Sequence, residues 1–434
     1  MKIHPTAAAA VACIESGQRV FVHGAAATPL ALLDGLIEHA PRLRNVELMH
    51  LHTAGDGRYA DPEFAESFRI SALFLGSNMR RRVDHERIDY IPCFLSETAM
   101  LIRTGRRPID VVLISVSPPD AHGYCTLGTS VDCTLAAVET AKVVIAQINS
   151  EMPRVHGDGF LHVSRITHAV EVSAPLPENP PEPLSETELA IGRHVASLVE
   201  DGACLQTGIG AIPDAALAAL ANHKHLGVHT EMWSDGMLPL FESGAIDNSR
   251  KAVHPGKTVA TFLMGSRKVF DHADDNPASV LLDVAYVNNT AVIARNDRVT
   301  AINSAVEIDL TGQVCADSVG HRVLSGVGGQ MDFIRAASLS KGGKPIIAIA
   351  SRTGHGIPRI VAELKPGAGV VTTRAHMHYV ATEFGVADLF GKTLNERARA
   401  LIELAHPDDR EALDRAWHDR RTATAGYTRR LEKH

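Results

Sequence analysis

Short, continuously apolar runs alternate with helical stretches along most of the chain, and this alternation constrains the fold more than any other feature. The runs are bounded by turn residues, as is typical of buried strands. Strands that are apolar throughout and separated by helices predict parallel sheets covered on both faces. We therefore predict an α/β protein. The expected strands are RVFVHG (19–24), VVLISVS (111–117), AKVVIAQIN (141–149), ACLQTG (203–208), LGVHTE (226–231), VIARND (292–297), PIIAIAS (345–351) and AGVVTT (368–373), and the clearest helices are 28–43 and 212–223.

A proline-rich stretch, SAPLPENPPEPLSETE at 173–188, interrupts this alternation. Proline stiffens the chain and is incompatible with a helix interior or a central strand, so we interpret the stretch as a linker. A chain of 434 residues is also too long for one ordinary core. We predict two similar open α/β domains, residues 1–178 and 179–434.

Two segments of the second half depart from the strand–helix alternation. Residues 299–314, VTAINSAVEIDLTGQV, have the pattern of two strands joined near Thr311 and Gly312, which predicts an antiparallel insertion. Beyond residue 392 the chain is helical and rich in charges on one side. We expect a closing helical tail with a solvated face.

Composition narrows the possible partners. A formal charge of −7 argues against a general nucleic-acid or anionic-membrane surface. No apolar run approaches the roughly 18 residues of a membrane helix, and Glu15 interrupts the alanine-rich start, so we expect an amphipathic first helix there. Six cysteines without a CxxC pair suit reduced thiols in a cytoplasmic protein.

Twenty-three histidines raise the possibility of a metal site. The closest pairs, His50/His52 and His376/His378, are spaced by two residues and lack the helical spacing of an HExxH motif. Such pairs share one strand face, which leaves a zinc site possible but weakly indicated. We expect no metal.

Two similar glycine turns each join an expected strand to an expected helix, one in each half. The first contains His23, Gly24 and Ala25, and the second contains Gly208 and Gly210. A glycine turn at a helix N-terminus exposes free N–H groups that can bind an anion or a carbonyl oxygen. Tight turns used only for packing explain them equally well. Neither turn has the spacing of a phosphate-binding loop or a dinucleotide fingerprint.

A third glycine-rich turn, LSGVGGQMDFIRAA at 324–337, is more specific. Gly326, Gly328 and Gly329 lie within four residues and are followed by Gln330 and a helix. Glycines at this density let the backbone pack against a ligand, and their N–H groups can bind an oxyanion or phosphate. We interpret this turn as functional.

Glu231 ends the apolar run Leu226–Thr230, where the sequence predicts a change from strand to helix. A carboxylate at this point can be an ordinary N-cap or first-turn acid that complements the helix dipole. The carboxyl end of a strand in an open α/β sheet is also where ligands bind. The local sequence alone favours the capping explanation.

Several long motifs resemble one known family. GIGAIPDAAL, HTEMWSDG, NSAVEIDLTGQV and GVGGQMDFIRAA occur in the order of the acetyl-CoA hydrolase/transferase family, and SPPDAHGYCTLGTSVD (117–132) and EMPRVHGDGFLHVSRI (151–166) resemble its N-terminal domain. The likeness covers nearly the whole chain and is strongest to the 4-hydroxybutyrate and butyrate CoA-transferases. It implies two domains of the NagB/RpiA/CoA-transferase type with the active site between them. It also implies a glutamate nucleophile, which falls here on Glu231.

The resemblance implies a CoA-transferase that moves CoA between a short-chain acyl-CoA and a small carboxylic acid such as 4-hydroxybutyrate, through a covalent enzyme intermediate. An acyl-CoA hydrolase needs only water at the same site, and a non-catalytic metabolite-binding protein is the alternative from another class. Coenzyme A is expected as part of the substrates. A homodimer or higher homo-oligomer is also expected.

Glu307 is the competing nucleophile. Strand alternation places it with Ala305 and Asp309 on one face of its segment, which is an ordinary polar face that could also line a cleft. We rank Glu231 above it.

The remaining assignments follow from the turns and from nearby basic residues. We expect backbone groups of Gly328 to act in catalysis, and Gly326, Gly328, Gly329, Gln330, Gly208 and Gly210 to contact CoA. Gln206 is expected to shape the acyl pocket, with His23, Gly24 and Ala25 opposite. Lys257, Arg267 and Lys268 are candidate partners for the CoA phosphates.

Overall fold

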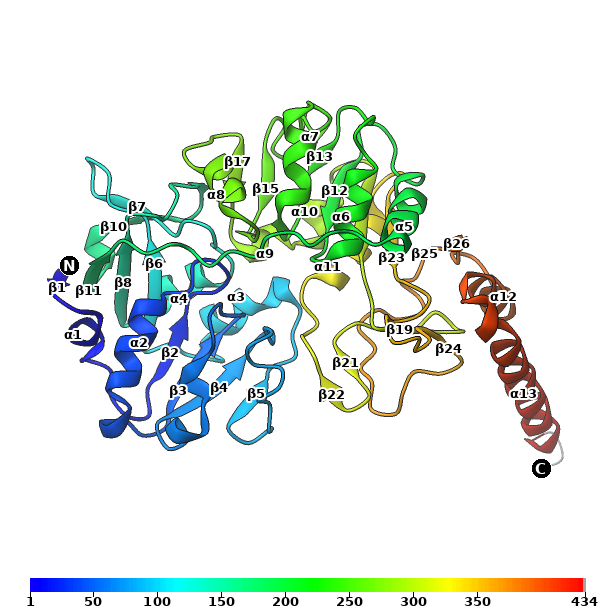
Figure 1. Cartoon of the computed structure of the whole chain (residues 1–434), viewed down its shortest axis with the longest axis horizontal. Helices are drawn as coiled ribbons and strands as arrows, with labels where there is room; N and C mark the ends of the chain where they lie inside the picture. The colour runs from blue at the N-terminus through cyan, green and yellow to red at the C-terminus, as the bar shows by residue number, and fades with distance from the viewer. Residues whose placement is uncertain (432–434) are drawn as a thin grey trace.

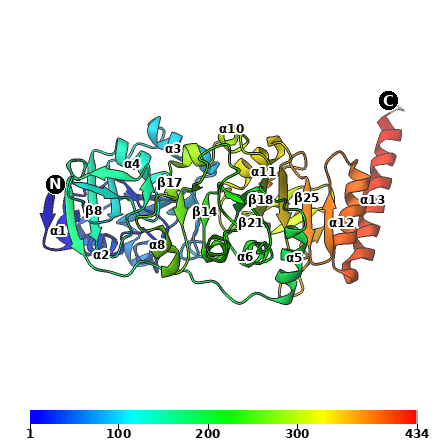
Figure 2. The ribbon, with the colours of Figure 1, turned by 90° about the horizontal axis from the view of Figure 1, so that it is seen from above.

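The computed structural model describes the backbone of residues 1–431 and the side chains of residues 1–423. Two sheets lie side by side in an elongated molecule, with the N-terminus at one end and the C-terminal helix at the other (Figures 1 and 2). Both sheets are built largely from parallel strands, so the predicted α/β class is confirmed. None of the helices within the described residues is long and apolar enough to span a membrane.

The first sheet contains eight strands, and every neighbouring pair is parallel. Alternate residues of one strand pack on opposite faces. Val20 and Val22 meet helix α2 (Leu30–Glu38), whereas Phe21 faces helices α3 (Leu95–Arg103) and α4 (Thr134–Thr140). This burial on both faces explains why the strands are apolar at successive positions. In spatial order the strands are β1 (Lys2–His4), β11 (His168–Val172), β8 (Val143–Asn149), β6 (Val111–Val116), β2 (Arg19–Val22), β3 (Val46–His50), β4 (Phe68–Ala72) and β5 (Ile88–Tyr90).

The second sheet contains six strands and is parallel except for its last pair. Helices α5 and α6 cover one face, and α11 and α12 pack on the other. In spatial order its strands are β13 (Gly227–Val228), β12 (Cys204–Thr207), β18 (Val299–Asn303), β23 (Lys344–Ala348), β25 (Tyr379–Thr382) and β26 (Gly385–Asp388).

The α-helices lie in some of the connections between strands and at the end of the described chain. They are α1 (Ala7–Val11), α2 (Leu30–Glu38), α3 (Leu95–Arg103), α4 (Thr134–Thr140), α5 (Glu186–Ala196), α6 (Ala211–Ala218), α7 (Leu238–Glu242), α8 (Arg267–Ala273), α9 (Val284–Val287), α10 (Thr290–Ile293), α11 (Gln330–Leu339), α12 (Leu394–Leu404) and α13 (Pro407–Leu431). The last two form the predicted helical tail, and α13 extends away from the body (Figure 1).

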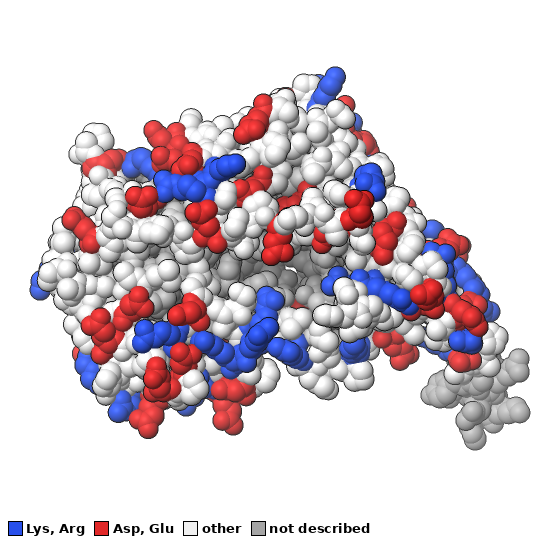
Figure 3. Space-filling view, in the orientation of Figure 1, with Lys and Arg blue, Asp and Glu red and all other residues white. Residues whose placement is uncertain are grey.

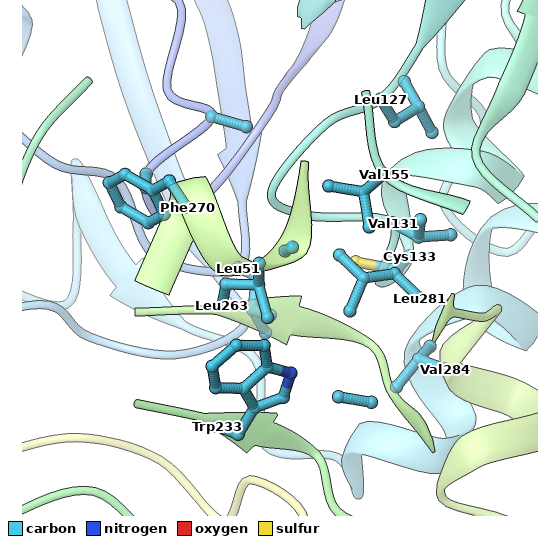
Figure 4. Close-up of a cluster of buried hydrophobic side chains, with 14 of the residues drawn as sticks. Leu51, Leu127, Val131, Cys133, Val155, Trp233, Leu263, Phe270, Leu281 and Val284 are labelled. Atoms are coloured by element: carbon cyan, nitrogen blue, oxygen red, sulfur yellow. The ribbon is translucent and has the colours of Figure 1, made fainter. Parts of the chain in front are cut away.

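Smaller strand groups join the two halves. The shortest first-half strand, β9, pairs with β17 of the second half, and a buried cluster around Trp233 and Leu263 also includes Leu51 (Figure 4). The linker crosses the molecule as an extended segment between β11 and α5 (Figure 1). The division at residues 178 and 179 stays a prediction.

The remaining strands of the described chain form five small groups. They are β14 (Met232–Trp233) with β16 (Phe262–Leu263); β15 (Thr258–Ala260), β17 (Ser279–Leu281) and β9 (His156–Gly157); β19 (Glu307–Asp309), β20 (Val314–Cys315) and β24 (Ile360–Val361); β7 (Tyr124–Thr126) with β10 (Phe160–His162); and β21 (Ser318–Val319) with β22 (Arg322–Val323).

Two sequence predictions need correction. Residues 292–297 are not a strand, because Asn289 caps helix α10 by accepting from the N–H groups of Ala291 and Val292, and the strand begins only at Val299. Residues 368–373 form no strand, only an isolated bridge at Thr372. The antiparallel pair predicted within 299–314 is confirmed as β19 with β20, and Thr311 and Gly312 lie in their connection. Residues 299–303 belong instead to the main parallel sheet. All six cysteines are free thiols, as expected.

Candidate active site

Two cavities meet at Glu231. The larger, which we call the interdomain cavity, has a volume of about 410 Å³ and is lined by residues of both halves and of the linker. The second, the glycine-loop cavity, has about 260 Å³ and is lined mostly by the second half. Both volumes are of the size that small-molecule sites occupy, or slightly below it. Figure 3 shows a hollow near the centre of one face, with Lys and Arg side chains gathered along its lower edge. The residues shared by the two cavities are Phe74, Ile209, Glu231 and Gly328.

The backbone of Glu231 lies between two short strands. β13 precedes it, and its carbonyl oxygen accepts from Thr261 N at 2.9 Å and Phe262 N at 3.3 Å as β14 begins. The predicted direct change from strand to helix is therefore wrong, since the pairing continues and the next α-helix starts at Leu238. Glu231 is neither the N-cap nor a first-turn residue of any helix, which excludes the capping explanation.

Two donors lie next to the carboxylate of Glu231. The N–H of Gly329 and the amide of Asn288 both lower the pKa of this group. The fit is tight, because a Cβ atom at Gly329 would lie 1.9 Å from Oε2 of Glu231 and 2.4 Å from Nδ2 of Asn288. Only a residue without a side chain can occupy position 329 with the carboxylate in this place.

A second acid, Asp332, is hydrogen-bonded to Asn288 and to a residue of the first half. Nδ2 of Asn288 donates to Oδ2 of Asp332 at 3.1 Å. Asp332 in turn accepts from the backbone N (3.1 Å) and the hydroxyl (2.7 Å) of Ser96 at the start of α3. The amide group of Asn288 thus lies next to both carboxylates, and a residue of the first half holds the second one.

The electrostatics of the site favour protonation of both acids. Burial and the nearby Asp332 carboxylate raise the pKa of Glu231 to about 7, against the lowering effect of the Asn288 and Gly329 donors. Burial raises the pKa of Asp332 to about 6, although Ser96 and Asn288 lower it. Among the described residues no lysine, arginine or histidine forms an ion pair with Glu231. A strongly shifted carboxyl group in a cleft is a mark of a functional site.

The glycine loop is fixed by the first half of the chain. Leu95 N donates to Gly328 O at 3.0 Å, Tyr90 Oη accepts from Val327 N at 2.8 Å, and Leu75 N donates to Ser325 O at 2.9 Å. Gly328 has a φ of +59°, a left-handed conformation that glycine adopts without strain.

The other predicted site residues of the second half are divided among the cavities. Gln206 and Gly208 line the glycine-loop cavity, as do Gly326, Gly328, Gly329 and Gln330. The Gln206 side chain exchanges two hydrogen bonds with Asn303, at 2.8 and 3.3 Å. Gly210, with φ +122°, lines a separate cavity of about 190 Å³ at the start of α6.

Of the three residues predicted opposite them, only Ala25 lines the interdomain cavity. His23 is fully buried behind it, with Nε2 2.7 Å from the carbonyl of Ser130 and Nδ1 accepting from Ser115 N at 3.3 Å. A Cβ atom at Gly24 would lie 2.8 Å from the His52 carbonyl, so Gly24 allows close backbone packing.

The predicted phosphate-binding residues are not brought to these cavities. Lys257 donates to the carbonyl of Pro277 at 3.0 Å, and Arg267 pairs with Glu151 and Asp271. Lys268 is exposed on α8. Among the residues that the structure describes, no group of three His, Cys, Asp or Glu side chains could hold a metal ion.

Glu307 lies in a different environment. Its side chain is 1% exposed, and it accepts from the backbone N of Lys365 at 2.8 Å and from Lys365 Nζ at 2.5 Å. The carboxylate is therefore neutralised by its own cation and lines neither cavity described above.

Sequence reasoning missed Asn288 and Ser96 and assigned no role to Asp332. Asn288 follows α9 in an ordinary Asn-Asn pair, and Ser96 begins a helix in the other half. Neither position has a local pattern that indicates chemistry. The proximity of Asp332 to the glycine turn was the one available signal.

Comparison with known proteins identifies the family of this chain. Residues 2–201 match the acetyl-CoA hydrolase/transferase N-terminal domain, and residues 265–417 match the C-terminal domain of the same family. A succinyl-CoA:acetate/propanoyl-CoA:succinate CoA transferase from Fasciola hepatica is 51% identical over 94% of this chain and 86% of its own length. A 4-hydroxybutyrate coenzyme A transferase from Clostridium kluyveri is 50% identical over 94% and 95%.

A solved structure extends the likeness to the fold. The 4-hydroxybutyrate CoA-transferase from Porphyromonas gingivalis superimposes with a TM-score of 0.83, at 37% identity, over 96% of this chain and 98% of that one. The chain therefore belongs to the acetyl-CoA hydrolase/transferase family of enzymes.

Proposed function

We propose that this enzyme transfers CoA between a short-chain acyl-CoA, such as acetyl-, butyryl- or succinyl-CoA, and a small carboxylic acid such as 4-hydroxybutyrate, with Glu231 as the nucleophile. The observation that carries the proposal is a glutamate without a cationic partner, with a pKa raised to about 7, at the junction of two cavities. The relatives that are 51% and 50% identical to this chain are named as CoA transferases, which supports the same reaction class.

The reaction proceeds in two halves. The Glu231 carboxylate attacks the thioester carbonyl, the carbon–sulfur bond breaks, and CoA leaves as a thiolate from a mixed acyl-glutamyl anhydride. The thiolate then attacks the glutamyl carbonyl, which releases the acyl group as a free carboxylate and leaves a glutamyl-CoA thioester. An acceptor carboxylate repeats both steps in reverse and departs as the new acyl-CoA.

The donors around Glu231 suit this sequence. The Gly329 N–H and the Asn288 amide, which lie next to the carboxylate in the resting enzyme, stabilise the oxyanion that forms when the thiolate attacks the glutamyl carbonyl. The Gly328 N–H has no hydrogen-bond acceptor among the described residues and serves the thioester oxygen of the substrate. This division refines the role that the sequence suggested for Gly328 and Gly329 together.

An acyl-CoA hydrolase would use the same acyl-enzyme and would need only water. Both covalent intermediates can be hydrolysed, so a transferase has to exclude water from the cleft. A non-catalytic binding protein gains nothing from an unpaired carboxylate whose burial costs free energy. Hydrolysis measured without an acceptor separates the first two activities.

The test is to trap the intermediate. The enzyme is incubated with acetyl-CoA in the absence of an acceptor and then treated with borohydride, which reduces a thioester but not a free carboxylate. The peptide that contains Glu231 should lose about 14 Da, because the side chain becomes an alcohol. A mass loss on the Glu307 peptide instead, with Glu231→Gln still active, would overturn the nucleophile assignment.

A further inference from the structure

The interdomain cavity holds two polar side chains that none of the steps above uses, Arg80 and His52. Arg80 comes from the loop after β4, and His52 follows β3, so the first half supplies both. They share the cavity with Glu231, which the second half supplies.

The Arg80 side chain has no hydrogen bond or ion pair with another described residue, and its Nε atom is buried without a partner. Most other arginines of the first half are engaged: Arg82 donates to the carbonyl of Gly57 and pairs with Asp61, and Arg87 donates to the carbonyl of Ala60. Arg80 is half-buried, and a guanidinium that lines a cavity with no acceptor among the described residues is suited to bind an anionic ligand there.

His52 provides a second unused donor or acceptor. Its Nε2 atom is buried and has no partner within the described residues, and its ring is packed edge-on against Phe74 (centroids 6.0 Å apart) and Phe262 (5.5 Å). Burial lowers the pKa of His52 below its ordinary value, which keeps the imidazole neutral. A neutral imidazole fixed by aromatic rings can hydrogen-bond an oxygen without adding charge.

We propose that Arg80 and His52 form a subsite for a carboxylate at the far end of the substrate, so that the preferred acid is a short dicarboxylic acid or its mono-CoA thioester. The proposal rests on the function proposed above, since Glu231 has to react with the other end of the same molecule. Arginine is suited to this role because its planar fork matches a carboxylate with two parallel hydrogen bonds. A monocarboxylic acid with an alkyl end leaves the guanidinium unpaired.

The anion could instead be a phosphate of CoA. The long pantetheine arm separates those phosphates from the sulfur, whereas Arg80 lines the same compact cavity as Glu231. Among the described residues that line this cavity, the other acid is Glu178 of the linker, which accepts the backbone N–H of Arg267 at 2.9 Å and so is not paired with Arg80. The geometry therefore favours the acyl end over the phosphates, and the experiment below distinguishes the two.

The experiment compares Arg80→Met with Arg81→Met, a matched control at the adjacent exposed arginine, which lines neither cavity. With acetyl-CoA as the donor, kcat/KM is measured for succinate, butyrate and 4-hydroxybutyrate as acceptors. Wild-type enzyme and Arg81→Met should prefer succinate. Arg80→Met should lower kcat/KM for succinate by about 10- to 100-fold, the usual range for a charge-assisted hydrogen bond, and change that for butyrate less than about threefold.

Three outcomes overturn the proposal. An equal loss for all three acceptors, with a raised KM for acetyl-CoA, would assign Arg80 to the CoA phosphates. A wild-type preference for 4-hydroxybutyrate that Arg80→Met leaves unchanged would mean that the subsite takes a hydroxyl. A wild-type preference for butyrate would mean an alkyl pocket. Absence of transfer to any acceptor by the wild-type enzyme would instead contradict the proposed function itself.

Discussion

Two glutamates of the second half, Glu231 and Glu307, differ in exposure and in what surrounds them, since Glu307 is fully buried and Glu231 is half-buried at two cavities. Glu307 is paired with Lys365 and lines neither cavity. Glu231 lies near a second acid, Asp332, and lines both cavities. Removing one partner of a buried ion pair leaves the other charge uncompensated and is destabilising. A buried carboxylate that lacks a cation is kept at a cost in stability, which is a mark of a functional site.

The largest effect should come from exchanging the two carboxylates for amides. Glu231→Gln retains size but loses the anionic nucleophile, so the rate of CoA transfer should fall by roughly 10⁴-fold or more. Glu307→Gln should keep activity within a few-fold and lower the free energy of unfolding by about 1–3 kcal/mol, because Lys365 loses its anionic partner. Steady-state kinetics and urea unfolding of both variants measure this. Similar rates of CoA transfer in the two variants would contradict the different roles assigned to Glu231 and Glu307.

The next effect tests how tightly Glu231 is placed. Gly329→Ala has no backbone obstacle, since φ is −95° there, but its Cβ atom would overlap Oε2 of Glu231. Displacement of the carboxylate and loss of its donor should lower kcat by about 10²–10³-fold, while the melting temperature changes little. If kcat stays near the wild-type value, the Gly329 contact is not part of the mechanism.

A smaller effect concerns pH. The wild-type kcat/KM should rise about tenfold per pH unit up to about pH 7, where Glu231 becomes a carboxylate, and then level off. Asp332→Asn removes the neighbouring negative charge, so the pKa of Glu231 should fall and this rise should move to lower pH. Turnover at pH 8 should stay within about tenfold of wild type. A pH–rate profile of the variant that overlays the wild-type profile would exclude Asp332 as the cause.

The last effect is on stability rather than activity. The raised pKa means that the folded state holds the Glu231 proton more tightly than the unfolded state, where the ordinary value is 4.5. The free energy of unfolding should therefore be highest below that value and fall as pH rises through about 7. Glu231→Gln should lack this part of the decline and be more stable at pH 8 by at most about 3 kcal/mol. Equal pH dependence of unfolding in both proteins would contradict the environment described for Glu231.

Much of the architecture could be predicted from the sequence, because each buried strand carries its signal locally. The strands at Val111–Val116 and Val143–Asn149 are continuous apolar runs, and both fall where predicted. The error at 292–297 arose where one capping side chain, Asn289, outweighs the local propensity. The pairing of Glu231 with β16 also depends on distant residues and was not foreseen.

The residues of the candidate site show the same contrast between local signals and signals that depend on distant residues. Glu231 and the glycine loop belong to contiguous motifs, so the sequence identified them as candidates. Asn288, Ser96 and Arg80 reach the site from other elements, and only tertiary packing brings them there. Basic residues near a motif, such as Lys257 and Arg267, line neither cavity, because proximity in sequence does not set the direction of a side chain.

The hydrogen bonds from Leu75, Tyr90 and Leu95 to the glycine loop have a consequence for synthesis of the chain. The loop follows those residues by more than two hundred positions, so the first half is complete long before its partner exists. Gly329 belongs to the same loop, so the donor beside the Glu231 carboxylate can be placed only after the second half has been synthesised and the loop has docked on the first half. Assembly of the site therefore requires both halves of the chain.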